Sequence, residues 1–312
     1  MSTDDRRWFH PRGQLARDGW QSVVDESLDG WAHTGLRVAE IGDGDRLTLD
    51  ETHVERMFVP LAGAFTVAYT DGTADETVRL TGRASVFSGP TDVLYLTAGA
   101  TATVTGRGRI AVAASPTADR LPTTYVPAAA TPVELRGAGR ASRQVHNFGT
   151  PEAVDAARLI VCEVITPAGN WSSHPPHKHD EHVAGHESRL EEIYYFEAAP
   201  ERGPGESADR DPADGADAFG MFSTYSSPAG DIDIDARVRT GDIALVPYGY
   251  HGPAAAAPGY DLYYLNVMAG PDPERTWLIS DDPAHAWVRE RWADETIDDR
   301  LPYGAEPKDG DR

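Results

Sequence analysis

The chain has 312 residues, 40% of them hydrophobic and 9% aromatic, a composition typical of a globular protein with one or two domains. Its formal net charge of −22 would repel the phosphates of nucleic acid, so we expect no nucleic-acid partner. No stretch approaches the roughly 18 consecutive apolar residues that a membrane span requires. The N-terminal segment lacks the apolar core of a signal peptide, so we expect a cytoplasmic protein.

The one cysteine, Cys162, excludes an intramolecular disulfide and a thiolate-rich metal site. It lies in the apolar run 159–165, which predicts a small buried core residue rather than a nucleophile. Only two of the 28 basic residues are lysines, Lys178 and Lys308, and the others are arginines.

Short runs rich in Val, Ile, Tyr and Thr recur between turn signals that are roughly 8–12 residues apart. In chain order they lie at residues 65–70, 92–96, 101–104, 110–113, 159–165, 192–196, 243–246 and 262–268. Helical periodicity is nearly absent, and the one candidate helix spans residues 283–293. The pattern predicts an all-β fold of sandwiches or barrels with little helix.

This strand pattern occurs twice, at about residues 20–120 and 140–270. The segment between the two blocks, 121–139, is rich in Pro, Ala and Gly and is predicted to be a linker or crossover. We therefore expect two β-barrels, an N-terminal one within residues 1–130 and a C-terminal one within residues 131–312. Residues 199–218 are dense in Gly, Pro, Asp and Glu, and we expect them to form a surface loop between two strands.

Candidate metal ligands gather in the second block. His177 and His179 are two residues apart, so a strand would put both imidazoles on one face. Glu192 begins the next strand-like run, and a hairpin would bring its carboxylate beside them. His251 ends the pattern Gly-x5-Pro-x-Gly-x-His, which predicts a strand, a tight turn and then a ligand. Three imidazoles and one carboxylate suit one divalent ion, Zn or Mn first, with Fe, Ni or Co as alternatives.

Other side chains compete with this ligand set. Glu192 lies thirteen positions after His179, and the insertion between them carries three rival ligands: His182, His186 and Glu187. Glu191 is a fourth rival, because only one of two adjacent strand residues can point inward. We favour Glu192, since Tyr194 and Phe196 then share its face.

The first block has no comparable cluster. Its histidines are His10, His33 and His53, and none belongs to a His-x-His pair. We expect this barrel to have kept its fold and lost its metal site, and to serve packing, oligomerisation or the shaping of the other site. A homo-oligomer formed through exposed barrel edges is one possibility.

The two-part ligand motif matches the cupin signature, although the common cupin pattern places its Glu four or five positions after the second His. Longer segments resemble the 5-deoxy-glucuronate isomerase family of inositol catabolism, bicupin relatives of the 4-deoxy-uronate ketol-isomerases. They include Pro-Pro-His-Lys-His-Asp at 175–180, Leu-Glu-Glu-Ile-Tyr-Tyr-Phe at 190–196, and residues 85–95, 142–149 and 259–270. The resemblance implies two jelly-roll barrels and a small sugar-acid substrate. It also implies a metal-dependent aldose–ketose isomerisation of 5-deoxy-D-glucuronate to 5-dehydro-2-deoxy-D-gluconate.

Such a reaction needs a group that moves a proton and a group that holds the substrate carboxylate. The predicted catalytic residues are His174, Tyr264 and Glu191, with His182, Tyr194 and Tyr250 as alternative bases. The predicted substrate-binding residues are Arg143, ahead of Arg189 and Arg289, together with His146, Tyr194 and Tyr250. Each tyrosine could instead pack in the barrel, and His146 could instead satisfy a core hydrogen bond. Competing functions are an Fe(II) cupin dioxygenase, a 4-deoxy-uronate ketol-isomerase and a non-catalytic sugar-binding cupin.

Overall fold

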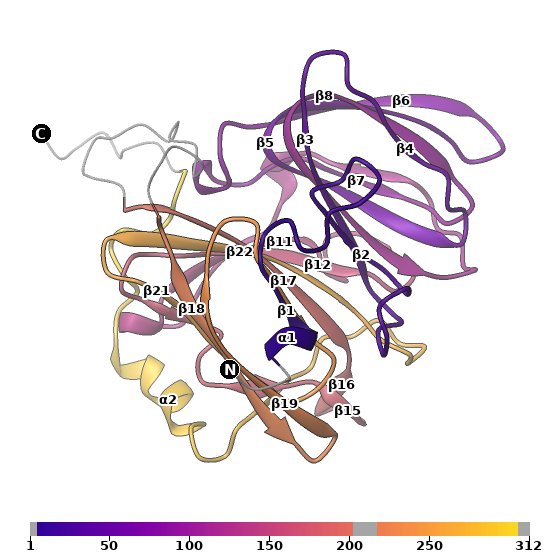
Figure 1. Ribbon diagram of the computed structural model, residues 1–312. Coiled ribbons are helices and arrows are strands. Elements are labelled where there is room, and N and C mark those ends of the chain that lie inside the picture. Colours follow the sequence, from indigo (N-terminus) through magenta and orange to yellow (C-terminus); the bar gives the residue numbers. More distant parts are fainter. Residues whose placement is uncertain (1–4, 202–216, 305–312) are drawn as a thin grey trace, which may run out of the picture.

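The computed structural model describes residues 5–201 and 217–304, which form two β-structured lobes (Figure 1). Within these ranges the α-helices are α1 (Asp5–Trp8) and α2 (Trp287–Glu290), and 3-10 turns cover Val86–Ser88, Ala128–Ala130, Gly139–Ala141 and Arg291–Asp294. None of the helices in this part of the chain is long and apolar enough to cross a membrane. The helix expected at 283–293 is reduced to α2 and the turn after it. The prediction of an all-β fold with little helix is confirmed.

The first lobe is one eight-stranded antiparallel sheet with the order β2-β3-β8-β5-β7-β9, in which β4 also pairs with β8 and β6 with β5. Its strands are β2 (Ser22–Val24), β3 (Gly35–Ile41), β4 (Leu47–Leu49), β5 (Val54–Thr70), β6 (Asp75–Arg83), β7 (Val93–Leu96), β8 (Thr101–Pro116) and β9 (Thr124–Val126). The runs expected at 101–104 and 110–113 therefore belong to one long strand.

Two glycines, Gly63 of β5 and Gly108 of β8, face each other across the first sheet. Both glycines have positive φ, and a Cβ at Gly63 or Gly108 would lie 2.0 or 2.1 Å from a backbone oxygen of the opposite strand. Only glycine allows the two backbones to approach this closely. The apolar interior of the lobe includes Phe58 and Phe65.

The second lobe has two main sheets. The seven-stranded sheet has the order β1-β20-β17-β22-β12-β11-β10, and the six-stranded sheet has the order β19-β18-β21-β14-β23 with β13 beside β21. The strands of the first are β1 (Phe9–His10), β10 (Val133–Arg136), β11 (Arg143–Gly149), β12 (Ile160–Thr166), β17 (Glu191–Pro200), β20 (Ile243–Val246) and β22 (Tyr260–Ala269). Those of the second are β13 (Trp171–Ser172), β14 (His177–Lys178), β18 (Gly220–Ser227), β19 (Gly230–Val238), β21 (Tyr250–Ala256) and β23 (Ser280–Asp281). A separate hairpin joins β15 (Asp180–Val183) to β16 (Glu187–Arg189).

Two segments belong to different parts of the fold from those that the sequence predicts. The stretch 121–139 contains β9, which pairs with β7, and β10, which pairs with β11, so it adds an edge strand to each lobe. The first strand, β1, pairs with β20 and thus belongs to the second lobe although it precedes the first lobe in the chain. Most of the loop expected at 199–218 lies outside the described residues.

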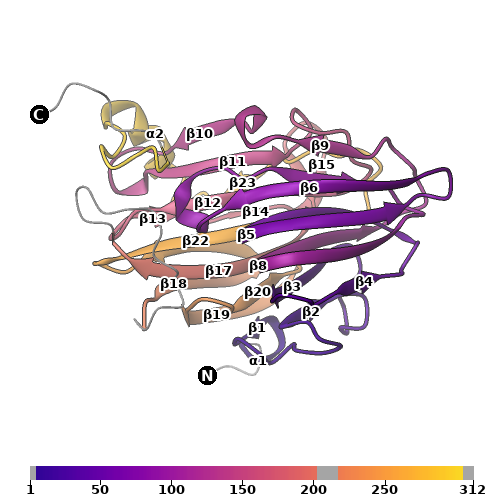
Figure 2. The same cartoon turned by 90° about the horizontal axis from the view of Figure 1, so that it is seen from above.

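The two lobes pack through their sheets, as both views show (Figures 1 and 2). One hydrophobic cluster contains Met57 and Val59 of β5 together with Val161 of β12 and Tyr195 of β17. Cys162, as predicted, is buried in it.

Ion pairs cross this apolar interface. The Arg83 guanidinium donates to both oxygens of Glu163 at 2.6 Å, and the Arg109 guanidinium donates to both oxygens of Glu197 at 2.7 Å. Burial opposes a charge on Glu163, but the Arg83 charge outweighs it and lowers the pKa of the carboxyl to about 2. Both lobes are therefore held in one register by buried, bidentate contacts.

Arg83→Met should lower the free energy of unfolding by about 3–5 kcal/mol, because Glu163 would stay buried without its cation. Urea-induced unfolding followed by tryptophan fluorescence measures the change. Arg79→Met is the matched control, since Arg79 is exposed on the same strand β6. That substitution should change the free energy by less than about 0.5 kcal/mol. Equal effects of the two substitutions would contradict the importance of this ion pair.

Candidate metal centre

The four predicted metal ligands lie together in the second lobe and are all buried. The ligand atoms of His179, Glu192 and His251 lie within 4.8 Å of one another. The Nε2 atom of His179 is 2.9 Å from Glu192 Oε2, and that of His251 is 3.1 Å from the same oxygen. The ring of His177 lies 4.5 Å from that of His251, measured between centroids.

Strand pairing explains how residues far apart in the sequence meet here. His177 of β14 pairs directly with His251 of β21. The N–H of Leu190 donates to the carbonyl of His179 at 2.9 Å, so the chain returns beside β14 before β17 begins. The thirteen-residue separation is taken up by the β15–β16 hairpin, which carries the rival ligands away from the cluster: His182 and His186 are exposed, and Glu187 contacts Lys178.

Each of the three imidazoles directs its Nδ1 atom to a backbone carbonyl. The Nδ1–O distances are 3.3 Å from His177 to Pro175, 3.2 Å from His179 to Leu190 and 3.2 Å from His251 to Gly249. Because a carbonyl only accepts, each Nδ1 is protonated and each Nε2 keeps its lone pair. The Nε2 of His251, although near Glu192, is buried and not aligned for a hydrogen bond. This arrangement fits a bound cation.

The charges of these groups also suit a bound cation. Burial alone would raise the pKa of Glu192, but the neighbouring imidazoles of His179 and His251 outweigh it and lower that pKa to about 2. Burial lowers the pKa of His177 well below its usual value, so its imidazole is neutral. One carboxylate and three imidazoles form a donor set for a divalent ion such as Zn or Mn.

A cavity of about 170 Å³ adjoins the cluster, and His177 and Glu192 line it. Ser173, Tyr194 and Tyr264 also face this cavity. The Ser173 hydroxyl lies 3.2 Å from that of Tyr194 and 3.3 Å from that of Tyr264. Burial raises the pKa of both tyrosines, so their hydroxyls are protonated at neutral pH and can donate.

Three arginines line the same cavity, and they differ in their partners. Arg136 pairs with Glu134, and Arg289 pairs with Asp281. Arg143 donates to a backbone carbonyl at 2.9 Å and has no carboxylate within ion-pair distance among residues 5–201 and 217–304. Burial lowers its pKa to about 10, which leaves it charged at neutral pH. The cavity therefore contains a buried cation that is free to bind an anion.

Glu191, predicted as a catalytic residue, does not face this cavity. Its carboxylate accepts hydrogen bonds from the backbone N–H groups of Ala32, His33 and Thr34 at 3.0, 2.7 and 3.2 Å. Adjacent residues of β17 point to opposite faces, so Glu191 turns to the first lobe when Glu192 turns to the metal centre.

Three other predicted site residues lie outside the cavity as well. Arg143 and Val145 of β11 line it, so His146 points to the other face, where its Nδ1 lies 2.6 Å from Glu163. His174 lines a neighbouring cavity, with its ring 5.6 Å from that of Trp171. Tyr250 stacks on Tyr225 at 5.3 Å.

The first lobe has the same strand pairing around different side chains. In the second lobe, Met268 of β22 pairs with both Glu192 and Ile160. In the first lobe, Ala114 of β8 pairs in the same way with both Arg56 and Gly35. Glu55, the residue before Arg56, binds backbone N–H groups of the other lobe just as Glu191, the residue before Glu192, does. Arg56 therefore has the position in β5 that Glu192 has in β17.

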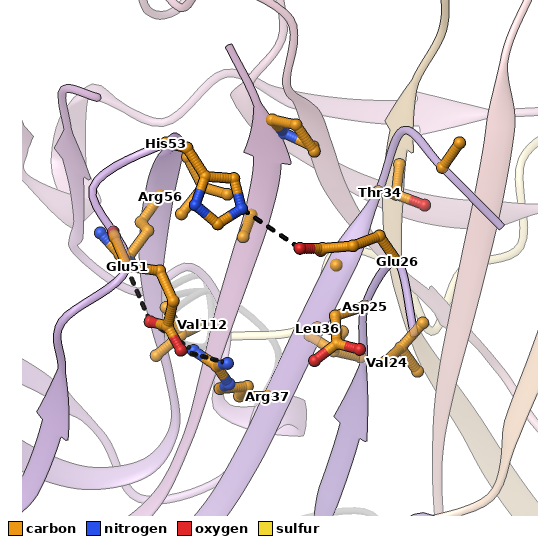
Figure 3. A pocket seen from close by; sticks show the side chains of 15 residues that line it. Val24, Asp25, Glu26, Thr34, Leu36, Arg37, Glu51, His53, Arg56 and Val112 are labelled. Atoms are coloured by element: carbon orange, nitrogen blue, oxygen red, sulfur yellow. Dashed lines mark hydrogen bonds and ion pairs between the residues drawn. The ribbon is translucent and has the colours of Figure 1, made fainter. Parts of the chain in front are cut away.

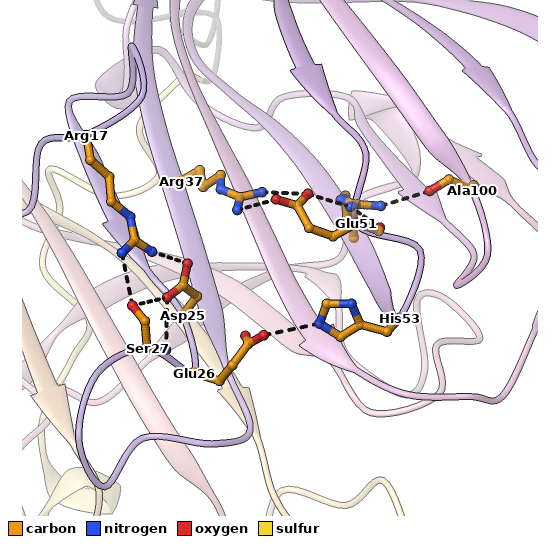
Figure 4. Close-up of polar contacts among 9 residues, drawn as sticks. Arg17, Asp25, Glu26, Ser27, Arg37, Glu51, His53 and Ala100 are labelled. Carbon is orange, nitrogen blue, oxygen red and sulfur yellow. Dashed lines mark hydrogen bonds and ion pairs between the residues drawn. The ribbon is translucent and has the colours of Figure 1, made fainter.

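The Arg56 guanidinium is 1% exposed and donates to the carbonyl of Ala100 and to Glu51. It borders a cavity of about 180 Å³, in which Glu51 lies between Arg37 and Arg56 (Figure 3). At this cavity Arg17 also pairs with Asp25, and His53 Nε2 lies 3.2 Å from a carboxylate oxygen of Glu26 (Figure 4). The first lobe thus has a fixed cation where the second has the carboxylate of Glu192.

Comparisons with protein families and with known proteins find relatives over most of the chain. The model of the KduI/IolB family matches residues 8–288. The 5-deoxy-glucuronate isomerase of Geobacillus thermodenitrificans (strain NG80-2) is 38% identical over 271 residues, which cover 86% of this chain and 90% of that protein. The one from Listeria monocytogenes serotype 4a is 36% identical over 264 residues, or 83% of this chain and 89% of that protein.

Solved structures agree with the predicted architecture. An IolB-like protein from Salmonella typhimurium LT2 matches with a TM-score of 0.76 and 33% identity, covering 90% of this chain and 98% of that one. An oxalate decarboxylase from Lactobacillus farciminis shares the fold alone, with a TM-score of 0.59 and 9% identity over 88% of each chain. The prediction of a bicupin fold is confirmed.

Glu192→Gln should weaken the binding of Zn²⁺ or Mn²⁺ by more than about 100-fold, since the loss of even an outer-shell partner costs roughly 10- to 100-fold. Isothermal titration calorimetry on protein stripped of metal measures this. Glu191→Gln is the matched control, because its side chain points to the other lobe, and it should stay within a few-fold of the wild-type affinity. A similar loss in both variants would contradict the assignment of Glu192 as the ligand.

Proposed function

The chain belongs to the KduI/IolB family, and we propose that it is a metal-dependent isomerase that converts 5-deoxy-D-glucuronate to 5-dehydro-2-deoxy-D-gluconate in myo-inositol catabolism. The observation that carries the proposal is the cavity in which Arg143 faces the same space as His177 and Glu192. A sugar acid offers one carboxylate to the arginine, and its aldehyde and neighbouring hydroxyl to the metal centre.

The reaction moves a proton from C2 of the substrate to its aldehyde carbon through an enediolate. A divalent ion, Zn or Mn in our proposal, held by His177, His179, Glu192 and His251 would stabilise the negative charge that develops on the two oxygens. The chain itself must hold the substrate in one orientation and provide the group that moves the proton.

Tyr264 is our candidate for that group. Its hydroxyl and that of Tyr194 both lie near Ser173 Oγ, so three hydroxyls adjoin one another in the cavity. Burial raises the pKa of Tyr264, and the nearby Arg143 charge partly offsets this increase. The proximity of a cation favours transient loss of the hydroxyl proton, so Tyr264 can both give and take a proton.

We further propose that the metal and active site belong to the C-terminal barrel, residues 131–312, and that the N-terminal barrel, residues 1–130, binds no metal. Arg56 supports this, because a fixed cation at the position of Glu192 removes a ligand and repels a divalent ion. The N-terminal barrel would then brace the other, through contacts such as those of Glu191.

Proton NMR in deuterated water tests the activity. Purified protein with Zn²⁺ or Mn²⁺ should convert 5-deoxy-glucuronate to the 2-keto product, with deuterium on the former aldehyde carbon. The reaction should proceed without oxygen, which a dioxygenase could not do, and should be slower with a 4-deoxy-uronate. An absence of conversion with either metal would refute the proposed activity.

Arg143→Met should raise KM for the sugar acid roughly 10- to 100-fold, because a hydrogen-bonded charged group contributes about 1.5–3 kcal/mol. Steady-state kinetics measure the change, and metal content should be unaltered. Arg143→Lys keeps the charge but lacks the planar guanidinium, so its KM should lie between those of the wild type and Arg143→Met. An unchanged KM in Arg143→Met would show that another group binds the carboxylate.

A further inference from the structure

Lys178 lies between two proposed metal ligands and points away from them. Since His177 and His179 face the metal centre, the residue between them faces the opposite side of the strand. Its ammonium lies 2.7 Å from Asp180 Oδ1, 2.8 Å from Glu187 Oε1 and 3.0 Å from Glu181 Oε2. Lys178 is buried although it is charged, which is unusual unless the charge is paired.

These carboxylates fasten the β15–β16 hairpin to β14. The same Glu187 oxygen that binds the ammonium also accepts from the backbone N–H groups of Asp180 and Glu181, at 3.0 and 3.1 Å. The hairpin occupies the insertion between His179 and Glu192, so its position determines where the chain returns to enter β17.

Asp180 extends this group of contacts to the third histidine. Its other oxygen, Oδ2, accepts from the backbone N–H of Gly249 at 2.8 Å and from the Ser227 hydroxyl. Gly249 is two residues before His251, and its carbonyl is the oxygen near His251 Nδ1. Gly249 has a positive φ, and a Cβ there would lie 2.4 Å from the side chain of Ile232, so this turn has little freedom to shift.

The choice of lysine follows from the geometry. Only two of the 28 basic residues of the chain are lysines, and one of them is here. Three acceptors converge on a single point, which suits an ammonium with its three N–H donors. A guanidinium is planar, and it is too large to place its donors at that point.

We infer that Lys178 is a positioning residue that holds the ligand-bearing segments of the metal centre in place through Asp180, Glu181 and Glu187. This inference rests on the metal centre of the proposed function. Its contacts reach His177 through β14, His179 through the adjacent Asp180, Glu192 through the hairpin, and His251 through Gly249. The three carboxylates also attract cations, and the ammonium keeps that position filled.

The test compares Lys178→Met, Lys178→Arg and Arg239→Met by titration with Co²⁺. Both Lys178 variants should bind Co²⁺ roughly 10- to 100-fold more weakly than the wild type and show an altered visible absorption spectrum, which reports ligand geometry. Arg239→Met is the control, because Arg239 forms an exposed ion pair with Asp217 in the same lobe. It should match the wild type in both measurements.

Wild-type affinity and an unchanged spectrum in Lys178→Met would overturn the inference, and so would full rescue by Lys178→Arg. If the Lys178 variants fail to fold by near-ultraviolet circular dichroism, Glu181→Gln replaces them. Glu181 is the half-exposed member of the three, and its loss should weaken Co²⁺ binding a few-fold. An unchanged affinity there would overturn the inference as well. Co²⁺ binding without isomerase turnover would refute the proposed activity and leave the role of Lys178 intact.

Discussion

Strand β17 buries carboxylates on both of its faces, and this constraint determines where the parts of the site lie. Glu192 faces His179 in the second lobe, while Glu191 binds backbone N–H groups of the first lobe. Glu197, again on the face of Glu191, binds Arg109. A shift of one residue in register would exchange the faces and leave buried carboxylates without donors, which costs several kcal/mol per ion. The register of β17, and with it the position of Glu192, is therefore tightly fixed.

Each lobe supplies a carboxylate that binds backbone N–H groups of the other lobe. Glu55 of the first lobe accepts from three consecutive backbone N–H groups, residues 157–159, at 2.6–2.7 Å. Glu191 of the second lobe does the same with residues 32–34. The sequence contains a signal that the two lobes are equivalent. Asp92, Gly99 and Thr101 in the first lobe have the same spacing as Asp242, Gly249 and His251 in the second. Comparison of these segments could have indicated which residues replaced the ligands of the first lobe.

The sequence predicts that the four proposed ligands gather at one place because the signals for them are local. His177 and His179 belong to one strand, and alternation along the next strand favours Glu192 over Glu191. The alternation of side chains along a strand shows which residues share a face, but not what packs against the face turned away from the metal centre. The contact of Glu191 with the first lobe therefore cannot be predicted from it. His146 shows the same limit: its partner Glu163 is on a neighbouring strand, and the Arg83 that neutralises that carboxylate is 80 residues away in the chain. Contacts of this kind depend on how two lobes pack, which no short pattern encodes.

The charge of the cavity argues for the class of substrate. Histidines are neutral when they act as ligands, so the proposed ligand set with a divalent ion carries one net positive charge, because Glu192 supplies the one negative charge. Arg136 and Arg289 are neutralised by their own carboxylates, whereas Arg143 adds a second positive charge. A sugar acid brings one negative charge in its carboxylate and develops a second on its oxygens as the enediolate forms. A neutral sugar would leave the Arg143 charge buried and uncompensated. The cavity is therefore best matched to a monocarboxylate at the moment of enolisation, when two charges of each sign face one another.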